Sequence, residues 1–246
     1  IIKCGSYTGN GSDGKQIDLG FEPQWVLLKR AEGTANWFLY DSMRGVGSGG
    51  SDQYLFPNAS NSEVANNVIR FLSNGFQLDT NSALLNGSNE DYIYIAIRRG
   101  PMKTPTSATE VFDIDNTPYS YGSDPAFRSD TVEVMDLSIQ RSTSSGQWFV
   151  GDRLRPFYYL NTASNNDEAL NNYAAFDYMN GFNSYTLSAS NYIGYLFRRA
   201  PGFFDMLNIQ QESGSGFKTV SHNLGVSPEL MILKSRFNDG NWVVWH

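Results

Sequence analysis

Short apolar and aromatic stretches alternate along the chain with polar turns, which is the pattern of many short β-strands. Residues 25–29 form an apolar run, residues 36–41 are rich in aromatic side chains, and residues 91–98 alternate tyrosine with aliphatic residues. Neighbouring side chains of a strand point to opposite faces, so a period of two indicates a strand with one buried face. Asn74-Gly75 and Asn180-Gly181 separate apolar stretches and predict hairpin turns, because both residue types tolerate positive φ.

Turn residues and composition favour the same fold class. A glycine and a proline within residues 20–23 mark the entry to the strand that begins near Gln24. Residues 62–71 have a weak helical period, which the two asparagines in the middle disfavour. Charged residues make up only 17% of the chain, and Asn, Ser, Gly and Tyr are plentiful. We therefore expect an all-β fold of tandem, jelly-roll-like antiparallel β-sandwiches with about seven or eight strands each.

The chain repeats itself. Residues 19–37 align with residues 224–242 without a gap, 205 positions apart, and seven of the nineteen positions are identical. Residues 91–101 return 100 positions later, at 191–201, where Tyr, Ile, two Arg and Pro recur in order. Such self-similarity is the signature of repeated domains.

The repeat predicts the domain organisation. We expect a first β-sandwich over residues 1–102, a second over 103–203, and the opening strands of a truncated third over 204–246. Those strands should either pack on the second unit or be completed by sequence outside this chain. The first residue is Ile1 and not Met, so we also expect the chain to be a piece of a longer protein.

Charge and hydropathy narrow the classes of partner. The net charge is −7 and the pI is about 4.8, without the dense Lys/Arg stripe that binds phosphate backbones, so nucleic acid is not the expected partner. No apolar run approaches the roughly 20 residues of a membrane helix, and we expect no membrane insertion. Cys4 is the single cysteine and forms no internal disulfide. A catalytic role for this thiol needs a histidine base, and a small residue of a first strand is the better interpretation.

Candidate catalytic and metal sites are weak. His222 and His246 have no recognisable carboxylate and nucleophile beside them, and a turn role suits His222. The glycines of residues 45–50 fit a phosphate-binding motif on paper, but no helix follows, so we expect a loop. Asp113 and Asp115 carry oxygen ligands for Ca²⁺ but lack the rest of a calcium loop. We expect no catalytic residue, no metal and no cofactor.

Carboxylates, arginines and tryptophans all have simpler structural interpretations. A glycosidase needs two acids about 5–9.5 Å apart, and nothing marks a pair among Glu90, Asp91, Glu133 and Asp136. Asp41 and Asp152 occupy matched repeat positions, where we expect them to bind loop amides after a strand. The following matched residues receive structural predictions as well: Arg98-Arg99 and Arg198-Arg199 should hold the next loop, and Trp37, Trp148 and Trp242 should be sheet and core residues.

Several of these segments together resemble a known repeated domain. They are YTGNG at 7–11, LGFEPQWVLLKR at 19–30, SNGFQL at 73–78, YIYIAIRRGP at 92–101 and YIGYLFRRAPGFFD at 192–205. They are similar to a domain of bacteriophage tail fibres and other virion proteins, many from marine and cyanobacterial phages. The resemblance implies lectin-like or laminin-G-like β-sandwiches strung along a virion appendage, and it transfers no catalytic residues.

The expected function is a structural and adhesive one. The chain would be a non-enzymatic segment of a tail fibre or similar appendage, located in the virion and extracellular when mature. Its partners would be copies of itself, for example in a trimer, other virion proteins and a host surface glycan. Loops 42–53, 81–90 and 161–167 would face the host, and multivalency would supply avidity. The alternatives are a carbohydrate-binding module with a defined sugar site, a polysaccharide depolymerase, and a capsid decoration or bacterial surface adhesin.

Overall fold

The chain forms two compact units built from antiparallel strands. The computed structural model describes residues 1–46, 52–66, 68–99, 103–116, 125–132, 135–142, 147–155, 158–170, 176, 178–182, 191–209 and 219–246. The first unit contains residues 1–101 and 207–222, and the second contains 102–206 and 223–246. In the described part of the chain, helical structure is limited to the 3-10 turn η1 (Ala108–Glu110) and the single 3-10 residue Asn191. No helix among these residues could cross a membrane. The predicted all-β class is confirmed.

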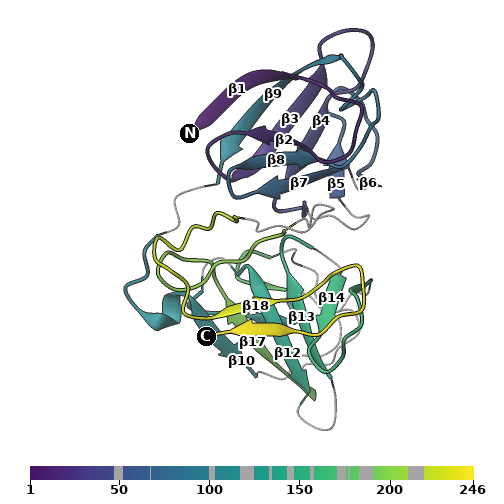
Figure 1. The fold of residues 1–246 in the computed structure, drawn as a ribbon. Helices are drawn as coiled ribbons and strands as arrows, with labels where there is room; N and C mark the ends of the chain where they lie inside the picture. Colours follow the sequence, from purple (N-terminus) through teal and green to yellow (C-terminus); the bar gives the residue numbers. More distant parts are fainter. Residues whose placement is uncertain are drawn as a thin grey trace. The chain divides into compact units, whose positions relative to one another are not determined.

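The first unit is a sandwich of two sheets (Figure 1). A six-stranded sheet has the order β1-β9-β3-β4-β5-β6, and a three-stranded sheet has the order β2-β8-β7. The strands are β1 Ile2–Thr8, β2 Lys15–Asp18, β3 Pro23–Arg30, β4 Phe38–Asp41, β5 Asp52–Leu55, β6 Val64–Asn66, β7 Ile69–Leu72, β8 Gly75–Leu78 and β9 Asp91–Arg98. Nine described strands thus exceed the expected seven or eight, because β6 and β7 lie where the sequence had suggested a weak helix.

Alternation along the central strands forms the core of the first unit. Val26 and Leu28 of β3 are fully buried, and so is Tyr40 of β4. They belong to one cluster with Phe76 and Leu78, which the three-stranded sheet supplies. Each such side chain contributes about 1.5–3 kcal/mol when it leaves water. The period of two that is visible in the sequence therefore selects the faces that meet between the sheets.

A buried asparagine closes one end of the first unit. The Asn86 side chain is fully buried. Its amide group donates to Asn10 Oδ1 (3.0 Å), Ser12 O (2.8 Å) and Thr80 O (2.8 Å), and its Oδ1 accepts from the Asn10 backbone N–H (3.0 Å). A buried amide is tolerated when its hydrogen bonds are made. Asn86 thus ties the loop before β9 to the loop between β1 and β2.

The second unit repeats the topology of the first. Its six-stranded sheet has the order β10-β17-β12-β13-β14-β15, and β11 pairs with β16 in a second sheet. The strands are β10 Phe112–Asp115, β11 Phe127–Arg128, β12 Leu137–Ser142, β13 Trp148–Asp152, β14 Tyr158–Asn161, β15 Ala169–Leu170, β16 Gly181–Phe182 and β17 Tyr192–Phe197. Counted along each unit, the last strand in both cases lies between the first and third strands, so the two units share one fold.

A two-stranded hairpin near the carboxyl end has the register of the β3–β4 hairpin. In it, β18 (Met231–Leu233) pairs with β19 (Val243–Trp245), and Met231 faces Trp245. Subtracting the repeat offset of 205 gives Val26 and Tyr40, which also face each other. The turn before each hairpin matches too, because Gly20 and Gly225 have φ values of 76° and 75°, a conformation that favours glycine.

The glycines after Asn74 and Asn180 have a different role from the predicted one. Gly75 does not sit at positive φ in a turn but is the first residue of β8, opposite Leu72. A Cβ there would lie 2.0 Å from Ile17 O, and a Cβ on Gly181, in β16, would lie 2.4 Å from Phe127 O. The β7–β8 hairpin turns through Ser73 and Asn74, one residue before the predicted turn. Gly181 begins β16, which pairs with β11 and not in a hairpin through Asn180. Close approach of a neighbouring strand is what requires these glycines.

Candidate functional site

A tight turn after β13 places an arginine against an aspartate of the same strand. The Asp152 Oδ1 accepts from the Arg155 backbone N–H (3.0 Å), and Oδ2 accepts from Arg155 Nε (2.6 Å). The Arg155 Nη2 also contacts this carboxylate, and both side chains are 5% exposed. The predicted role of Asp152, to bind loop amides after the strand, is confirmed. The sequence analysis missed its arginine partner.

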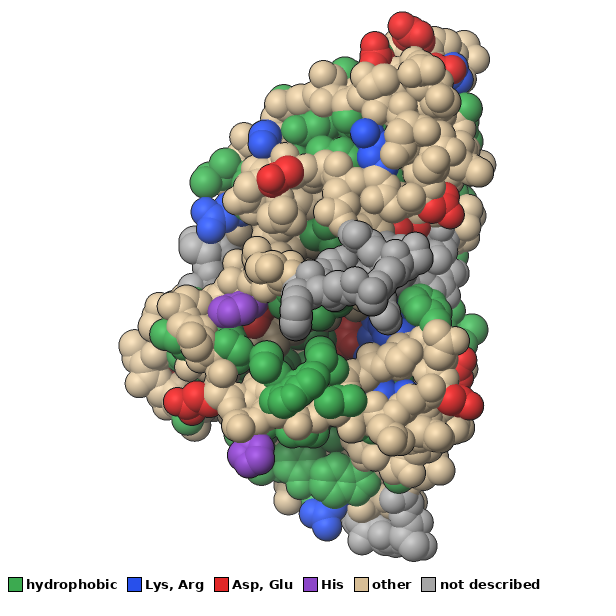
Figure 2. Space-filling model, viewed as in Figure 1, with side chains coloured by type: hydrophobic (Ala, Val, Ile, Leu, Met, Phe, Trp, Pro, Cys, Tyr) green, Lys and Arg blue, Asp and Glu red, His purple; other side chains and the backbone are tan. Residues whose placement is uncertain are grey.

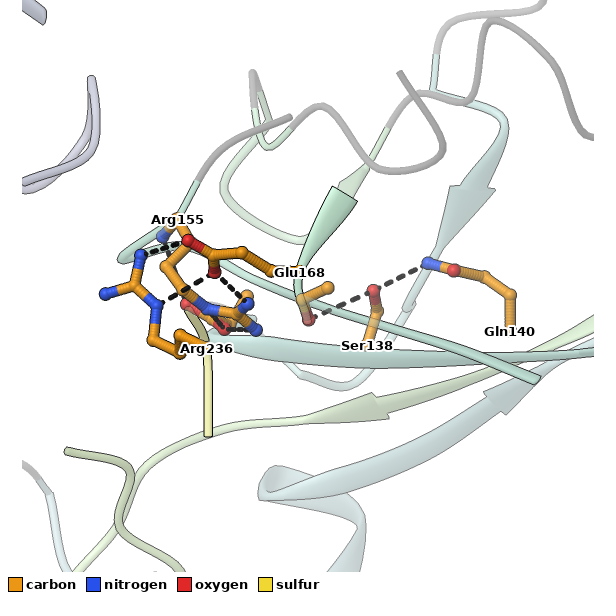
Figure 3. Close-up of polar contacts among 7 residues, drawn as sticks. Ser138, Gln140, Arg155, Glu168 and Arg236 are labelled. Atoms are coloured by element: carbon orange, nitrogen blue, oxygen red, sulfur yellow. Dashed lines mark hydrogen bonds and ion pairs between the residues drawn. The ribbon is translucent and has the colours of Figure 1, made fainter. Parts of the chain in front are cut away.

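Two further residues from distant parts of the chain complete an arginine–carboxylate cluster, which consists of Asp152, Arg155, Glu168 and Arg236 (Figure 3). Glu168, just before β15, accepts from Arg155 Nη1 at 2.9 Å. It also accepts from Arg236 Nε and Nη2, both at 2.8 Å, in a bidentate arrangement. Glu168 is 4% exposed. Two carboxylates and two guanidinium groups thus balance each other in a site that is largely closed to water.

The cluster suits a structural joint and not acid–base chemistry. Burial alone would lower the pKa of Arg155, but the charges of Asp152 and Glu168 and their hydrogen bonds outweigh it, so its pKa lies above the ordinary value. Asp152 and Glu168 both accept hydrogen bonds from arginines. What the geometry does provide is a firm link between segments far apart in sequence.

The first unit carries the same arrangement in a more open form. Asp41 Oδ1 accepts from the backbone N–H groups of Met43 and Arg44, both at 3.0 Å, as predicted for this aspartate. Arg44 Nε donates to Asp41 Oδ2 at 2.7 Å, and its Nη1 reaches Glu63 at 3.2 Å. The side chains of Arg44 and Glu63 are 31% and 41% exposed. Glu63 thus has the role of Glu168, but among the described residues no second arginine pairs with it as Arg236 pairs with Glu168.

The loop between β18 and β19 docks onto loop 161–168 through backbone groups as well. Lys234 Nζ donates to Asn165 O (3.1 Å) and Asn166 O (2.7 Å). The Gly240 N–H donates to Asn165 O (2.7 Å), and Trp242 Nε1 donates to Asn161 O (3.0 Å). Loop 161–167, which we expected to face a host, therefore binds the carboxyl-terminal hairpin of the same chain.

The other two loops expected to face a host differ in how much of them the structure describes. Loop 81–90 contains Asn86 and is tied down by it. In loop 42–53, residues 47–51 lie outside the described part of the chain. Most of the glycine-rich motif at 45–50 therefore also lies outside it.

Two inward polar residues lie beside the cluster in the second unit (Figure 3). Ser138 and Gln140 of β12 are fully buried, and Gln140 Nε2 donates to Ser138 Oγ at 2.8 Å. Among the described residues, the Gln140 Oε1 atom has no hydrogen-bond partner. By register along the shared topology they correspond to Val26 and Leu28 of the first unit. The second core is therefore more polar at this position.

The predicted candidate carboxylates serve structure. Asp113 Oδ2 accepts from Ser129 Oγ (2.5 Å), and Asp115 Oδ2 accepts from the Arg128 backbone N–H (2.7 Å). Within the described residues, no group of three or more His, Cys, Asp and Glu side chains is placed to hold a metal ion. Three of the four acids considered for a glycosidase pair also have structural partners: Glu90 pairs with Arg30, Asp91 accepts from Thr8, and Asp136 accepts from the Arg199 N–H. The fourth, Glu133, lies outside the described residues.

The recurring arginine pair has the predicted structural role in the second unit. Arg199 is 2% exposed, and its Nε donates to Asp205 Oδ1 at 2.6 Å. The other oxygen of Asp205 accepts from the Asn223 N–H at 2.7 Å. Arg199 therefore holds the loop that follows β17 and, through it, the start of the carboxyl-terminal segment. Cys4 lies in β1 and is exposed, and His222 lies in an irregular segment.

The matched tryptophans depart from the prediction of sheet and core residues. Trp37 and Trp242 lie just before β4 and β19, outside the strands, and are only partly buried. Trp148 lies on β13 but is 39% exposed, so it is a sheet residue and not a core residue. Its ring lies 6.3 Å from Tyr195, with planes 18° apart, and Tyr195 lies 6.4 Å from Phe112, with planes 14° apart. The Arg141 guanidinium lies 5.2 Å from the Trp148 ring centre. These four residues form an aromatic row across β10, β17, β12 and β13.

Comparison with known proteins covers only the first unit. Residues 2–101 match a domain of unknown function, DUF7483. This match spans the strands β1–β9 and less than half of the chain, and its description carries no activity. No curated protein and no solved structure matches the chain. Function must therefore be argued from the geometry of the two units.

Proposed function

We propose that the chain is a non-enzymatic structural and adhesive segment of a phage tail fibre or similar virion appendage. The observation that carries the proposal is the docking of the β18–β19 hairpin, which has the register of β3–β4, on the loop before β15 through Arg236 and Glu168. A joint of this kind lets one repeat follow another. A rod of such repeats presents many identical contacts to a surface, and multivalency raises the overall affinity.

The virion location rests on the resemblance of the repeated segments to tail-fibre domains and is tested on particles. Antibodies raised against the purified chain should label the appendages of phage particles from the source in electron micrographs, at a regular position. The purified chain should also slow adsorption of those particles to their host cells. An unrelated β-sandwich protein of similar charge is the control. Absence of label on the particles, together with unchanged adsorption, would refute the virion role.

A carbohydrate-binding module is the second candidate function, and the aromatic row of Phe112, Arg141, Trp148 and Tyr195 favours it. Exposed aromatic faces stack on sugar rings and combine apolar area with polar edges at a low cost in entropy. In this case, a glycan array should show binding that Trp148→Ala abolishes and that Trp37→Ala, at the matched position of the first unit, leaves intact. Release of shorter fragments from the bound polysaccharide would instead indicate a depolymerase.

A further inference from the structure

The β18–β19 hairpin exposes apolar side chains on both of its faces, and Figure 2 shows an apolar patch over the face of the hairpin turned to the viewer. The residues are Met231 (45% exposed), Ile232 (55%), Leu233 (42%), Val243 (43%), Val244 (54%) and Trp245 (50%). Scattered apolar residues on a surface are ordinary, but a contiguous patch marks an interaction site. The side of the hairpin loop that carries Arg236 docks on the second unit, while the strands themselves remain open.

The first unit shows what covers a hairpin of this register. The residues 205 positions earlier on the inner face are Val26, Leu28, Phe38 and Tyr40, which are at most 4% exposed. Two contacts close them off from water. The three-stranded sheet packs over this face, and β9 pairs along the free edge of β3, with Tyr94 opposite Leu28 and Ala96 opposite Val26.

Among the described residues, no strand lies along the corresponding edge of β18. In the described part of the chain, β18 pairs with β19 alone. An unpaired edge next to exposed apolar side chains is a template for another strand. The occupant is indicated by the repeat itself, because the register, the turn glycine and the lysine at the strand end all match. Lys29 Nζ donates to Arg30 O, and Lys234 Nζ likewise donates to Ser235 O.

We propose that β18 accepts a strand of the β9 type, antiparallel and in the register of β3 and β9. Such a strand has the alternation of Asp91–Arg98: two tyrosines and an alanine face inward, and isoleucines face outward. A second copy of β18 fits less well. Two β18 edges paired with each other would bring no inward tyrosines to cover Leu233 and Trp245. This inference rests on the internal repeat and does not depend on where the protein is located.

The test supplies the strand and measures hydrogen exchange at β18. By the repeat offset, His246 corresponds to Asp41, so the full chain is extended after His246 with a copy of its own residues 42–101. The matched control carries Tyr92→Asp and Tyr94→Asp in the appended copy alone, which removes the inward tyrosines. Backbone amides of β18 should exchange at least about tenfold more slowly in the extended chain than in the control. Peptides from β3 and β12 report whether both units remain folded.

Each outcome decides the proposal. Slower exchange at β18 in the extended chain, but not in the control, supports it. Equal exchange in the extended chain and the control, with both units folded, would overturn it. Slow exchange at β18 in the unextended chain, together with a dimer in light scattering, would show that a second copy holds the edge and would overturn it as well. None of these readings depends on host binding, so failure here is distinguishable from failure of the proposed virion role.

Discussion

Replacing Glu168 by alanine should destabilise the second unit strongly, and replacing Glu63 should hardly affect the first. Both glutamates accept from the arginine of an Asp-x-x-Arg turn, so the pair of variants changes the same chemistry at matched positions. They differ in burial, because Glu168 is 4% exposed and Glu63 is 41% exposed.

The expected magnitudes follow from the contacts. Glu168 accepts three charge-assisted hydrogen bonds, from Arg155 and twice from Arg236. Such bonds contribute about 1.5–3 kcal/mol each, but water returning to Arg236 offsets part of the loss. Removing one partner of a buried ion pair costs about 3–5 kcal/mol, and we expect Glu168→Ala to fall in that range. An exposed pair is worth about 0.2–1 kcal/mol, which is our expectation for Glu63→Ala.

The assay is hydrogen exchange with mass spectrometry in rising urea, since it reads each unit separately. For an m-value of about 1.5 kcal/mol per M, the midpoint of the second unit should fall by about 2–3 M in Glu168→Ala. Peptides over residues 234–242 should lose protection first, since Arg236 loses its anchor. High salt should weaken the exposed Arg44–Glu63 pair more than the buried cluster. Equal losses in the two variants would refute the assignment of the cluster as a buried joint.

Three further predictions concern the first unit. The buried Tyr92 hydroxyl donates to Ala83 O (2.7 Å) and accepts from the Gly87 N–H (2.8 Å), so Tyr92→Phe should cost about 1–3 kcal/mol in urea unfolding, and an unchanged midpoint would contradict this. Burial, followed by the nearby Tyr92, raises the pKa of Tyr7 above the ordinary value of 10.0. The contribution of Tyr7 to stability is therefore complete below pH 10 and is lost as the pH rises toward its pKa in the folded protein. An ultraviolet titration in which all tyrosines of the folded protein ionise near pH 10 would disprove this prediction. Gly20→Ala meets no atom within 4 Å but has a φ of 76°, so it should cost about 1 kcal/mol from backbone strain alone, and a thermal melt without a downward shift would argue against that strain.

Local pattern was sufficient for the fold class and for several strands. The alternation of tyrosine with aliphatic residues predicted a strand over residues 91–98, and β9 has those bounds. The predicted run at 25–29 lies within β3. These strands have one face against a core, so burial imposes a period of two that is visible in sequence. In β12 the same reasoning would bury Leu137 and Ile139, whereas Ser138 and Gln140 point inward.

The candidate site was only half visible in sequence. Matched repeat positions singled out Asp41 and Asp152 as structural residues, and their hydrogen bonds to loop amides agree. The signal for the arginines was the shared Asp-x-x-Arg spacing, and the repeat alignment also placed Glu63 opposite Glu168. The pairing of Arg236 with Glu168 joins residues 68 positions apart. Pairing over such a distance depends on how loops meet, and a local pattern does not encode it.

The exposure of Trp148 had no sequence signal for a similar reason. Trp37, Trp148 and Trp242 are matched in the repeat, and one environment was expected for all three. Trp148 instead lies on the outer side of β13 beside Arg141 and Tyr195. Trp37 and Trp242 lie just before β4 and β19 and are partly buried. Repeat alignment thus conserves the position along the chain, while burial depends on what packs against each side chain.

The buried Asn86 also determines how the protein should be produced. Asn86-Gly87-Ser88 is an acceptor sequence for N-linked glycosylation, which eukaryotic secretory cells attach to the unfolded chain. A glycan on this nitrogen would leave no room for its hydrogen bonds to Asn10, Ser12 and Thr80. Modification and closure of the first unit are therefore mutually exclusive, and a bacterial cytoplasm is the suitable host for expression.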